Sequence, residues 1–580
     1  MKGDRIWNIR ELSEEEQALA QQLSKELKIS FLSARLLVVR GLKTADEARQ
    51  YIRPNLDELN DPFLMRDMDK AVERIERAIR DKERIMVYGD YDVDGTTAVA
   101  LMYTFLSSLT SNLQFYIPDR FKEGYGISFQ GIDQAHADGC TLIVALDCGI
   151  KSVDKVEYAK KYGIDFVICD HHTPGEEIPD AVAVLNMKRK DCPYPYKELC
   201  GCGVGFKLVQ AYVGKNHLAY DLKQCLPLLA LAIASDIMPV TGENRVLAHY
   251  GLKELSTHPS IGLAALIEVA GLKGMPITMT DIGFKIGPRI NACGRLYSGS
   301  EAVKMLLTSD VEQAQQYARD IDAYNIERRQ YEMQIVKEAL EMLDADGLEK
   351  DKHTTVVYKP DWHSGVVGIA AGKLTENYFR PTIVLTRGES GILTGSARSA
   401  GGFDIYSAID SCRDLLTNFG GHAFAAGLSL KEDNLPEFKE RFEQYVAQHI
   451  RPEQMIPKLE AEVEVKFADI TPQLMSVIRC LEPFGPENPR PVFVTRNVIN
   501  HRYTKRVGKE GEHLHLDVTD TTAAITGVAF GFGDLALYMQ NGKAVDLCYE
   551  LNENVFNGIK STQVMVKDMK EVGRSAEEKR

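Results

Sequence analysis

Residues 85–98, IMVYGDYDVDGTTA, combine the end of a strand, an acidic loop and the start of a helix. The apolar beginning is typical of a buried strand, and the apolar segment after the loop is typical of a helix. Between them lie Asp90, Asp92 and Asp94, followed by Gly95. Such loops form ligand sites at the carboxyl ends of parallel strands. Three carboxylates so close together repel one another unless a positive charge separates them, and a divalent metal ion is the simplest such charge.

Two other interpretations of this loop have to be weighed. An Asp-rich turn needs no metal, because Asp and Gly are common turn residues. An EF-hand calcium loop needs a bidentate Glu at its twelfth position, but the twelfth residue counted from Asp90 is Leu101. The EF-hand is therefore excluded, and the choice between a plain turn and a metal loop depends on the rest of the chain.

The composition is that of an ordinary globular protein with several domains: 580 residues, of which 26% are charged and 44% are hydrophobic. A net charge of −14 disfavours a passive DNA coat but allows an enzyme with a local basic groove. The N-terminus lacks a signal-peptide core, and no run of about 18 apolar residues occurs, so we expect a cytoplasmic protein. Cys192, Cys200 and Cys202 are not spaced like the ligands of a zinc ribbon, and we expect buried thiols there.

From residue 85 to about residue 240, strand candidates alternate with segments of helical composition. This alternation favours an α/β fold with a mostly parallel sheet and helices on both faces. The strand candidates are residues 85–87, 113–117, 142–146, 166–169 and 181–185.

Acids and imidazoles follow where several of these apolar runs stop. Asp147 follows the third strand candidate, Asp170, His171 and His172 follow the fourth, and Asp236 follows an apolar helix. Singly, such an Asp is commonly a helix N-cap and such a histidine pair is commonly exposed. Jointly, carboxylates and a neutral imidazole suit Mn²⁺ or Mg²⁺, and their number favours two ions about 3.5–4 Å apart that share one Asp.

The order of the patterns predicts a multidomain chain. Its expected parts are a helical N-terminal cap at 1–70, the parallel-sheet domain at 71–300, a long connecting helix at 301–350, a second and smaller α/β domain at 351–455, a β-barrel at 456–568 and a charged tail at 569–580.

Two later segments have the composition of ligand sites. Gly420 and Gly421 allow close approach of the backbone, and His422 follows them. With Arg398, whose planar guanidinium suits phosphate oxygens, they favour a phosphate site over a surface loop. In the expected barrel, basic and aromatic side chains that can contact nucleic acid interleave, although any single aromatic is more simply explained as barrel interior. These barrel residues are Arg502, Tyr503, Lys505, Arg506, Phe530 and Phe532.

The motifs taken together resemble the DHH phosphoesterases. The set Asp92, Asp94, Asp147, Asp170-His171-His172 and Asp236 is similar to the four motifs of that superfamily. Further segments resemble its RecJ branch, including the DHHA1 and OB domains, in the same order along residues 50 to 570. These segments are 89–95, 118–120, 123–126, 287–292, 395–399, 420–422 and 481–489. Many members carry His where this chain has Tyr88, and some carry a further C-terminal domain whose role is not carried over.

The resemblance implies a metal-dependent exonuclease that hydrolyses single-stranded DNA from 5′ to 3′ into mononucleotides, in recombination and repair. We expect two Mn²⁺ or Mg²⁺ ions, with Asp147 as the bridge and His172 near the phosphate. The expected metal ligands are Asp90, Asp92, Asp94, Asp147, His171 and Asp236. The expected substrate-binding residues are Arg120, Tyr125, Arg289, Asn291, Ser396, Arg398, Gly420, Gly421 and His422.

The implied partners are single-stranded DNA, a single-stranded-DNA-binding protein and a RecQ-type helicase, with the protein itself a monomer that does not bind membranes. Two alternatives remain. One is a DHH hydrolase acting on pyrophosphate, short oligonucleotides or a cyclic dinucleotide, which the OB-like segment disfavours. The other is a non-catalytic replication scaffold with a decayed metal site, which the intact set of acids disfavours.

Overall fold

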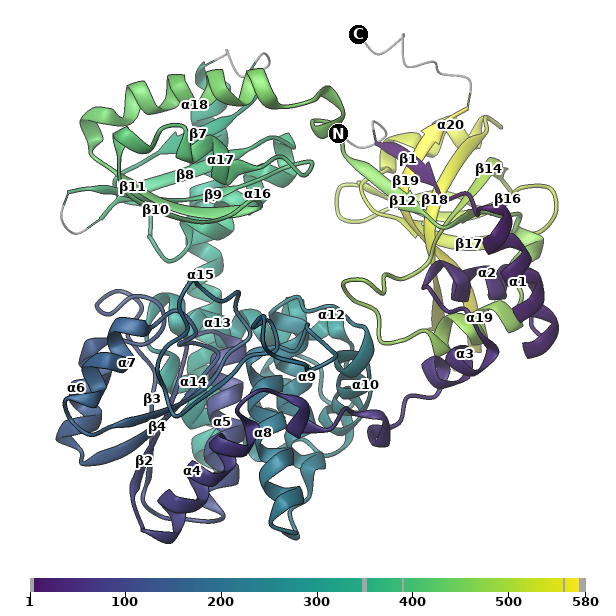
Figure 1. The fold of residues 1–580 in the computed structure, drawn as a ribbon. Coiled ribbons are helices and arrows are strands. Elements are labelled where there is room, and N and C mark those ends of the chain that lie inside the picture. The colour runs from purple at the N-terminus through teal and green to yellow at the C-terminus, as the bar shows by residue number, and fades with distance from the viewer. Residues whose placement is uncertain (1–4, 347–351, 389–390, 557–558, 573–580) are drawn as a thin grey trace. The chain divides into compact units, whose positions relative to one another are not determined.

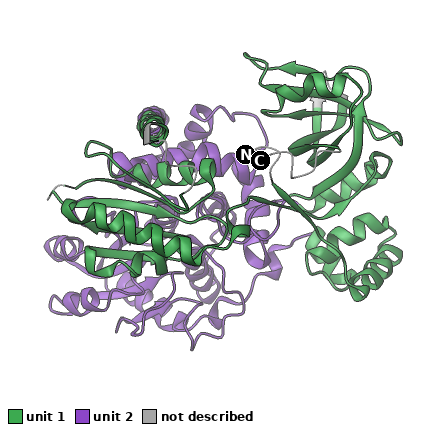
Figure 2. Ribbon diagram, turned by 90° about the horizontal axis from the view of Figure 1, so that it is seen from above, with its two compact units in different colours: residues 1–52, 330–481, 490–580 green, residues 53–329, 482–489 purple. Residues whose placement is uncertain are grey.

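The computed structural model describes the chain except residues 1–4, 347–351, 389–390, 557–558 and 573–580. The chain divides into two compact units (Figure 2). Unit 1 contains residues 1–52, 330–481 and 490–580, and unit 2 contains residues 53–329 and 482–489. Among the described residues, no helix is both long enough and apolar enough to cross a membrane.

Unit 2 is built on the predicted parallel sheet. Its five strands are ordered β3-β2-β4-β5-β6, and every neighbouring pair is parallel. The strands are β2 (Arg84–Gly89), β3 (Leu113–Tyr116), β4 (Cys140–Leu146), β5 (Asp165–Cys169) and β6 (Ala183–Leu185). Parallel pairing in this order brings the carboxyl ends of β2, β4 and β5 side by side at one edge.

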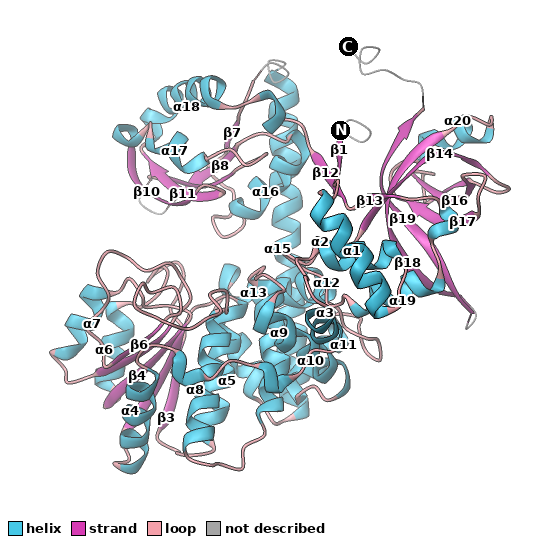
Figure 3. Cartoon of the chain, turned by 45° about the vertical axis from the view of Figure 1, so that its right-hand side comes forward, coloured by secondary structure: helices cyan, strands magenta, loops and turns pink. Residues whose placement is uncertain are grey.

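Both faces of this sheet are covered, which explains why β2, β4, β5 and β6 are largely apolar rather than alternating with polar residues. Ile85 and Val87 pack into one core, and Met86 and Tyr88 into another on the opposite face. The first core lies against α4 (Met68–Arg80), α5 (Val93–Ser107) and α8 (Gly201–Lys215), and the second against α6 (Phe129–Ala137) and α7 (Val153–Lys160), as Figure 3 shows.

The rest of unit 2 is mainly helical, and several of its helices pack against α5. A third core joins these helices around Leu231, Ile282 and Ile290. The elements are α9 (Leu226–Ser235), α10 (Gly242–Thr257), α11 (Ile261–Val269), α12 (Met279–Asp281), a π-helical turn (Ile282–Ile286), α13 (Gly287–Leu296) and α14 (Gly299–Leu307). The long α15 (Val311–Asp346) begins in unit 2 and ends in unit 1.

Unit 1 contains the smaller α/β domain that the sequence predicts, which is drawn in teal to green in Figure 1. Its mixed sheet has the order β10-β11-β9-β8-β7, in which only β7 and β8 pair in parallel. The strands are β7 (Thr355–Tyr358), β8 (Thr382–Arg387), β9 (Leu393–Arg398), β10 (Leu416–His422) and β11 (Ala425–Leu430). One face packs on α17 (Ile405–Asp410) and α18 (Leu435–His449), and β8 and β9 contact α16 (Val367–Tyr378).

The second part of unit 1 is a closed β-structure. Seven strands follow the order β13-β14-β18-β19-β17-β16-β15, and a further pairing of β14 with β16 closes the ring. About five strands were expected, and the additional ones include the short β13 and β15. The elements are β13 (Val463–Glu464), α19 (Pro472–Cys480), β14 (Val492–Asn500), β15 (Lys505–Val507), β16 (His513–Thr519), β17 (Ala524–Ala529), α20 (Ala536–Gln540), β18 (Val545–Phe556) and β19 (Ile559–Glu571). The predicted parallel-sheet domain, smaller α/β domain, long helix and barrel are thus confirmed.

The N-terminal residues belong to unit 1 through a strand pairing. β1 (Ile6–Ile9) pairs in parallel with β12 (Lys458–Ala461), and α1 (Glu14–Leu27), α2 (Phe31–Val39) and α3 (Ala45–Ile52) follow it. The Trp7 indole donates to Asp568 Oδ2 over 2.8 Å. Arg40 donates to both carboxylate oxygens of Glu462, over 3.3 and 3.1 Å. The segment expected to be a helical cap thus contains helices and also contributes a strand to this unit.

The Arg40–Glu462 ion pair gives a test of this attachment. The side chains of Arg40 and Glu462 are only 4% and 12% exposed, so Arg40→Ala would leave a buried carboxylate without its ion-pair partner. We expect a loss of about 3 kcal/mol in the free energy of unfolding of this region. Urea unfolding followed by Trp7 fluorescence, in a Trp362→Phe background, measures it.

Arg49→Ala is the matched control, because Arg49 pairs with Asp46 on the surface, where both side chains are mostly exposed. Exposed pairs contribute little to stability, so this variant should unfold at nearly the wild-type urea concentration. Equal effects of the two substitutions would contradict a stabilising role for the buried pair.

Candidate metal centre

The predicted acids converge where the sheet ends. The amide of Asp147 donates to Cys169 O over 2.9 Å, and the amide of Asp170 donates to Leu185 O over 3.0 Å. These bonds continue the β4–β5 and β5–β6 pairings by one residue, so both acids leave the sheet at the same edge. The parallel order of the strands therefore brings together residues far apart in the sequence.

The acidic loop after β2 turns directly into α5. Asp92 is the N-cap of α5, and its Oδ1 accepts a hydrogen bond from the Gly95 amide over 3.0 Å. Asp94, in the first helical turn, accepts hydrogen bonds from the amides of Gly201 (2.6 Å) and Cys202 (2.7 Å) at the start of α8. Two helix N-termini therefore face these carboxylates, and their free amides stabilise negative charge.

Two glycines are required by the close packing of this loop. A Cβ on Gly95 would lie 2.5–2.7 Å from the backbone of Asp90. A Cβ on Gly201 would lie 2.5 Å from Asp147 Cβ and 2.6 Å from its Oδ1. Only residues without a side chain fit at these two positions, so both contribute to the site although neither carries a functional group.

His171 lies among three carboxylates. Its Nε2 is 3.2 Å from Asp147 Oδ1, 3.6 Å from Asp236 Oδ2 and 3.8 Å from Asp94 Oδ2. Asp236 is the C-cap of α9, where a carboxylate is disfavoured by the helix dipole, so its position has no stabilising explanation of its own. Burial lowers the pKa of His171, which keeps the imidazole neutral, as a metal ligand must be.

The ligand atoms fall into adjoining groups. Asp94, His171 and Asp236 offer atoms within 4.8 Å of one another, and so do Asp90, Asp92 and Asp147. Asp147 also groups with His171 and His172 at the same spacing. Asp147 thus lies between the two sets, as a bridging ligand of two metal ions would.

Unsatisfied polar atoms in this cluster fit a cation. Within the described part of the chain, the carboxylate oxygens Asp90 Oδ1 and Asp147 Oδ1 are buried and have no hydrogen-bond partner. Buried acceptors of this kind are costly unless something binds them. A set of carboxylate oxygens with one imidazole matches Mn²⁺ or Mg²⁺, and the residues present therefore fit the metal that the sequence predicts.

The pKa values of the acids show the same need for positive charge. Burial, and then repulsion from Asp92, raises the pKa of Asp90 to about 8. Burial and then Asp94 raise the pKa of Asp236 to about 8, and burial and then Asp94 also raise that of Asp147. Burial raises the pKa of Asp94 as well, although His171 opposes it. Without a cation, Asp90 and Asp236 therefore bind protons near neutral pH, and the pKa values of Asp94 and Asp147 are shifted in the same direction.

Asp170 organises the imidazole next to the cluster instead of joining it. Its Oδ1 accepts hydrogen bonds from the amides of His171 and His172 and lies 2.8 Å from His172 Nδ1, while its Oδ2 accepts from the Ile150 amide. Burial raises the pKa of Asp170, but the hydrogen bonds from His172 and the amides outweigh it and hold the pKa below its usual value. Asp170 therefore stays ionised, and its charge raises the pKa of His172 despite burial.

The residues expected to bind substrate in unit 2 divide into two groups. Tyr125 places its hydroxyl 3.0 Å from His172 Nε2, and the Arg120 guanidinium lies 5.2 Å from the centre of the Tyr91 ring, which is edge-on to Tyr125. These side chains form an aromatic and basic rim beside His172.

Asn291 and Arg289 make contacts within the fold. Asn291 Oδ1 accepts a hydrogen bond from the Val93 amide over 3.2 Å and so holds the acidic loop. Arg289 donates to Asp322 over 2.9 Å and to the carbonyls of Lys285 and Val269. Its expected phosphate contact would have to compete with these bonds, and it stays a prediction.

Tyr88 does not reach the cluster. Its side chain faces the α6–α7 side of the sheet, and its hydroxyl donates to Gly126 O and accepts from the Ser128 amide, both over 3.1 Å. It therefore anchors the loop that carries Tyr125 and does not point toward the metal ligands.

The expected phosphate residues of unit 1 share one face of its sheet. Arg398 and His422 both pair with Ala425, and Ser396 and Gly420 both pair with Gly427, so the four residues lie on the same face. The Arg398 and Ser396 side chains approach Gly368 in the first turn of α16. Burial lowers the pKa of Arg398, and no carboxylate pairs with it among the described residues. Gly421, at φ = 148°, has no room for a Cβ beside Ala426.

The barrel aromatics divide by burial. Phe532 is 6% exposed and therefore buried, so its expected stacking on bases is not supported. Tyr503 and Phe530 are 62% and 53% exposed, and Lys505 Nζ lies 4.8 Å from the centre of the Tyr503 ring. The exposed pair and the lysine are suited to single-stranded nucleic acid.

Sequence reasoning missed the contribution of α8. Cys200 is the N-cap of α8, and all eleven cysteines are free thiols. The start of α8 serves the site through the backbone amides of Gly201 and Cys202. The glycine-rich run GCGVG at 201–205 was the available signal, because glycines at a helix start indicate close approach. Asn186, which donates to His172 O over 2.9 Å, gave no signal.

Three family models match the chain in order. They are "DHH family, N-terminal domain" at residues 84–233, "DHHA1 domain" at 351–448 and "RecJ OB domain" at 461–568. The single-stranded-DNA-specific exonuclease RecJ of Bacillus subtilis is 37% identical, over 96% of this chain and 70% of that protein. The Escherichia coli RecJ is 34% identical, over 92% of this chain and 95% of its own. The chain belongs to the RecJ family.

Solved RecJ structures agree with this assignment. RecJ from Thermus thermophilus in complex with Mn²⁺ has a TM-score of 0.84 at 26% identity, covering 99% of this chain and 81% of that one. Its complex with Mg²⁺ has a TM-score of 0.79. The resemblance inferred from the motifs is confirmed, and the relatives bind the two metals that the acids of this chain predict.

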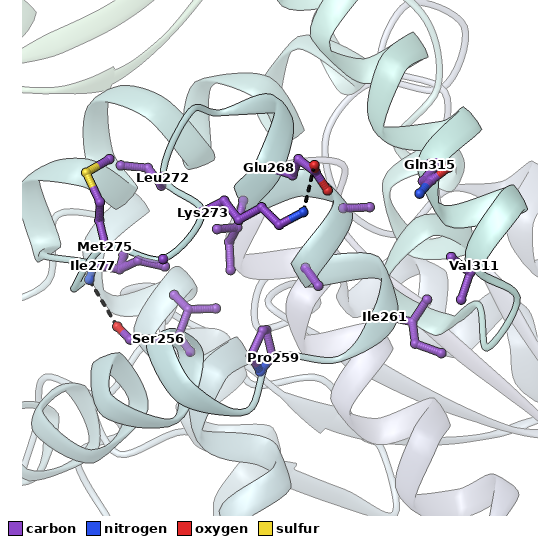
Figure 4. Close-up of a pocket in the computed structure, with 15 residues that line it drawn as sticks. Ser256, Pro259, Ile261, Glu268, Leu272, Lys273, Met275, Ile277, Val311 and Gln315 are labelled. Atoms are coloured by element: carbon purple, nitrogen blue, oxygen red, sulfur yellow. Dashed lines mark hydrogen bonds and ion pairs between the residues drawn. The ribbon is translucent and has the colours of Figure 1, made fainter.

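A separate pocket of unit 2 lies outside this centre. It has a volume of about 290 Å³ and is lined mainly by apolar side chains of α10, α11 and the loop after α11, with the Glu268–Lys273 ion pair at its side (Figure 4). Its lining lacks the metal-ligand set of the RecJ-family centre, so we assign it no part in catalysis.

Gly201 tests the packing of the RecJ-family centre. We expect Gly201→Ala to displace Asp147 and to weaken Mn²⁺ binding at least about tenfold, because the added methyl cannot fit beside this carboxylate. Isothermal titration calorimetry measures the affinity. Gly214→Ala, on the same helix where a Cβ meets nothing within 4 Å, is the control and should bind Mn²⁺ normally. Equal affinities would refute the required close approach.

The raised pKa values predict an unusual pH dependence of stability without metal. The folded pKa of Asp90 and Asp236 is about 8, against about 3.9 in an unfolded chain. The folded state therefore binds more protons, and lowering the pH from about 8 towards 4 stabilises it at this site. In EDTA, we expect a higher Tm at about pH 6 than at about pH 8.5, and a larger gain on adding Mn²⁺ at the higher pH.

The Asp90→Asn/Asp236→Asn double variant is the control for this comparison. Neutral amides do not titrate in this range, so the difference in Tm between the two pH values should shrink. A wild-type Tm in EDTA that rises with pH would contradict the assigned pKa directions.

Proposed function

We propose that this RecJ-family chain is a metal-dependent exonuclease that hydrolyses single-stranded DNA. The observation that carries the proposal is the convergence of Asp94, His171 and Asp236 with Asp90, Asp92 and Asp147 into adjoining groups of ligand atoms. The related proteins named for this activity match nearly the whole chain, which extends the argument from the site to the substrate.

The side chains divide the work of phosphodiester hydrolysis. Bound Mn²⁺ or Mg²⁺ ions would lower the pKa of a coordinated water and neutralise the charge that develops on the phosphate. Asp147 would contribute to both ion sites, while Asp94, Asp236 and His171 would hold one ion and Asp90 and Asp92 the other. No covalent nucleophile is required.

His172 would act on the phosphate itself. Asp170 stays ionised, orients the imidazole through Nδ1 and favours its protonated form. A cationic His172 can then donate a hydrogen bond to a phosphate oxygen and stabilise the transition state. Tyr125 and Arg120, on the rim beside it, would position the nucleotide.

Unit 1 would bind the single-stranded DNA. Arg398 and Ser396, near the start of α16, together with Gly420, Gly421 and His422, are suited to a terminal phosphate, because the guanidinium lacks a carboxylate partner among the described residues. Tyr503 and Phe530 would stack on bases with little sequence preference. The barrel favours a polymer over pyrophosphate or a cyclic dinucleotide, and the complete ligand set disfavours a decayed scaffold.

The direction of digestion, the products and the biological role are proposed from membership of the RecJ family. We propose 5′-to-3′ polarity, mononucleotide products and a role in cytoplasmic DNA recombination and repair. We also propose a monomer that cooperates with a single-stranded-DNA-binding protein and a RecQ-type helicase.

Digestion of end-labelled single-stranded DNA tests the activity. We expect release of labelled mononucleotide first from the 5′ end with Mn²⁺ or Mg²⁺, no release in EDTA and little digestion of blunt duplex. Release from the 3′ end would correct the polarity alone. An absence of metal-dependent release would refute the exonuclease.

Asp147→Asn tests the shared ligand. Asn tolerates the φ of 58° at this position but carries no charge, so the fold should persist while the rate falls more than about 100-fold. Asp154→Asn, on the exposed surface of α7, should keep the wild-type rate. A normal rate for Asp147→Asn would refute its bridging role.

A further inference from the structure

The residue after Asp236 combines an unfavourable backbone with an exposed apolar side chain. Ile237 has φ = 55°, a region that β-branched residues avoid. It also exposes 73% of its surface, although isoleucine is among the residues most often buried. Single exposed apolar residues are common, but here the exposure coincides with backbone strain and with a candidate metal ligand as neighbour.

The strain follows from how α9 ends. The Met238 amide donates to Ile233 O over 3.1 Å, and Asp236 is the C-cap, so Ile237 occupies the left-handed position of a helix-ending turn. Glycine is the usual residue there, because it has no Cβ to clash. The turn thus fixes the backbone conformation, and the isoleucine is an unfavourable choice for it.

Unit 2 contains the same turn with other residues. α11 ends with Gly271 at φ = 72°, where the Leu272 amide donates to Ile267 O over 3.0 Å. α8 ends with His217 at φ = 50°, where the Leu218 amide donates to Val213 O over 3.1 Å. Ile237 and Thr521 are the only β-branched residues with positive φ in the described part of the chain.

Packing does not explain the isoleucine either. The buried residue of this turn is Met238, which is 6% exposed and packs into the core between the sheet and helices α4, α5 and α8. Glycine at 237 would relieve the backbone and remove little buried surface. A residue that costs stability without structural benefit, beside a reactive centre, points to a functional role.

We propose that Ile237 is a substrate-contact residue, whose side chain packs against the deoxyribose or base of the nucleotide held at the metal centre. The inference rests on the proposed exonuclease activity. Consecutive Cα atoms lie about 3.8 Å apart, so the side chain emerges one residue from Asp236, whose carboxylate faces His171. An apolar contact of this kind is independent of base identity, which suits an enzyme that degrades any sequence.

Ile237→Gly separates this role from a structural one. We expect Tm equal to or above that of the wild type, because the strain is relieved, and KM for a mixed-sequence single-stranded oligonucleotide with Mn²⁺ raised about fivefold or more, because an apolar contact is lost. Ile237→Val keeps the β-branched contact and should keep KM within about twofold of the wild type.

His217→Gly is the matched control. It relieves the same backbone conformation at the far end of α8, some fifteen residues or about 22 Å from the amides that bind Asp94. Its Tm should change as that of Ile237→Gly does, while its KM and kcat stay at the wild-type values.

The outcomes distinguish the inference from the activity on which it rests. A wild-type protein without metal-dependent hydrolysis would refute the exonuclease, whatever residue 237 does. An active wild type with an Ile237→Gly variant of unchanged KM would refute only the contact. A marked fall in Tm for Ile237→Gly, absent in His217→Gly, would show that Ile237 supports the fold and would also overturn the proposal.

Discussion

The repulsion among carboxylates that share one buried position is the constraint on which this structure depends. Asp90, Asp94 and Asp147 are each at most 2% exposed, so water screens their charges poorly. The chain compensates in part with backbone, since the amides at the start of α8 bind Asp94. That compensation is incomplete, because buried oxygens of Asp90 and Asp147 keep no hydrogen-bond partner among the described residues. A bound divalent cation would complete the arrangement by neutralising these charges.

The parallel sheet makes such a cluster possible. Strands β2, β4, β5 and β6 are buried over most of their length, so the polar groups of the loops gather at the ends of the strands. The helices then bring in what the sheet lacks: α9 supplies Asp236 and α8 supplies amides. Close approach of these layers excludes side chains at Gly95 and Gly201, and the geometry of the centre is therefore set as much by residues without functional groups as by the ligands.

The side chains expected to bind metal could be predicted from the sequence, whereas the backbone groups and long-range contacts that position them could not. Acids after apolar runs predict Asp147, His171 and the parallel sheet, because strand ends and metal ligands both leave local signals. The amides of Gly201 and Cys202, the anchoring of the Tyr125 loop by Tyr88 and the bonds of Arg289 to Asp322 depend on contacts distant in the sequence. Likewise, the pairing of β1 with β12 joins residues some 450 positions apart, which no local pattern can indicate.

Asp147 and Ile237 both adopt left-handed conformations, at φ of 58° and 55°, and both lie at the metal centre or next to it. Asp tolerates this region, because its short polar side chain can satisfy local hydrogen bonds, whereas isoleucine does not. The difference suggests different reasons for the two residues. At Asp147 the turn aims a ligand between two sets of acids, and a tolerant residue suffices. At Ile237 the turn would serve equally well with glycine, so the backbone does not account for the isoleucine, and the side chain needs a role of its own.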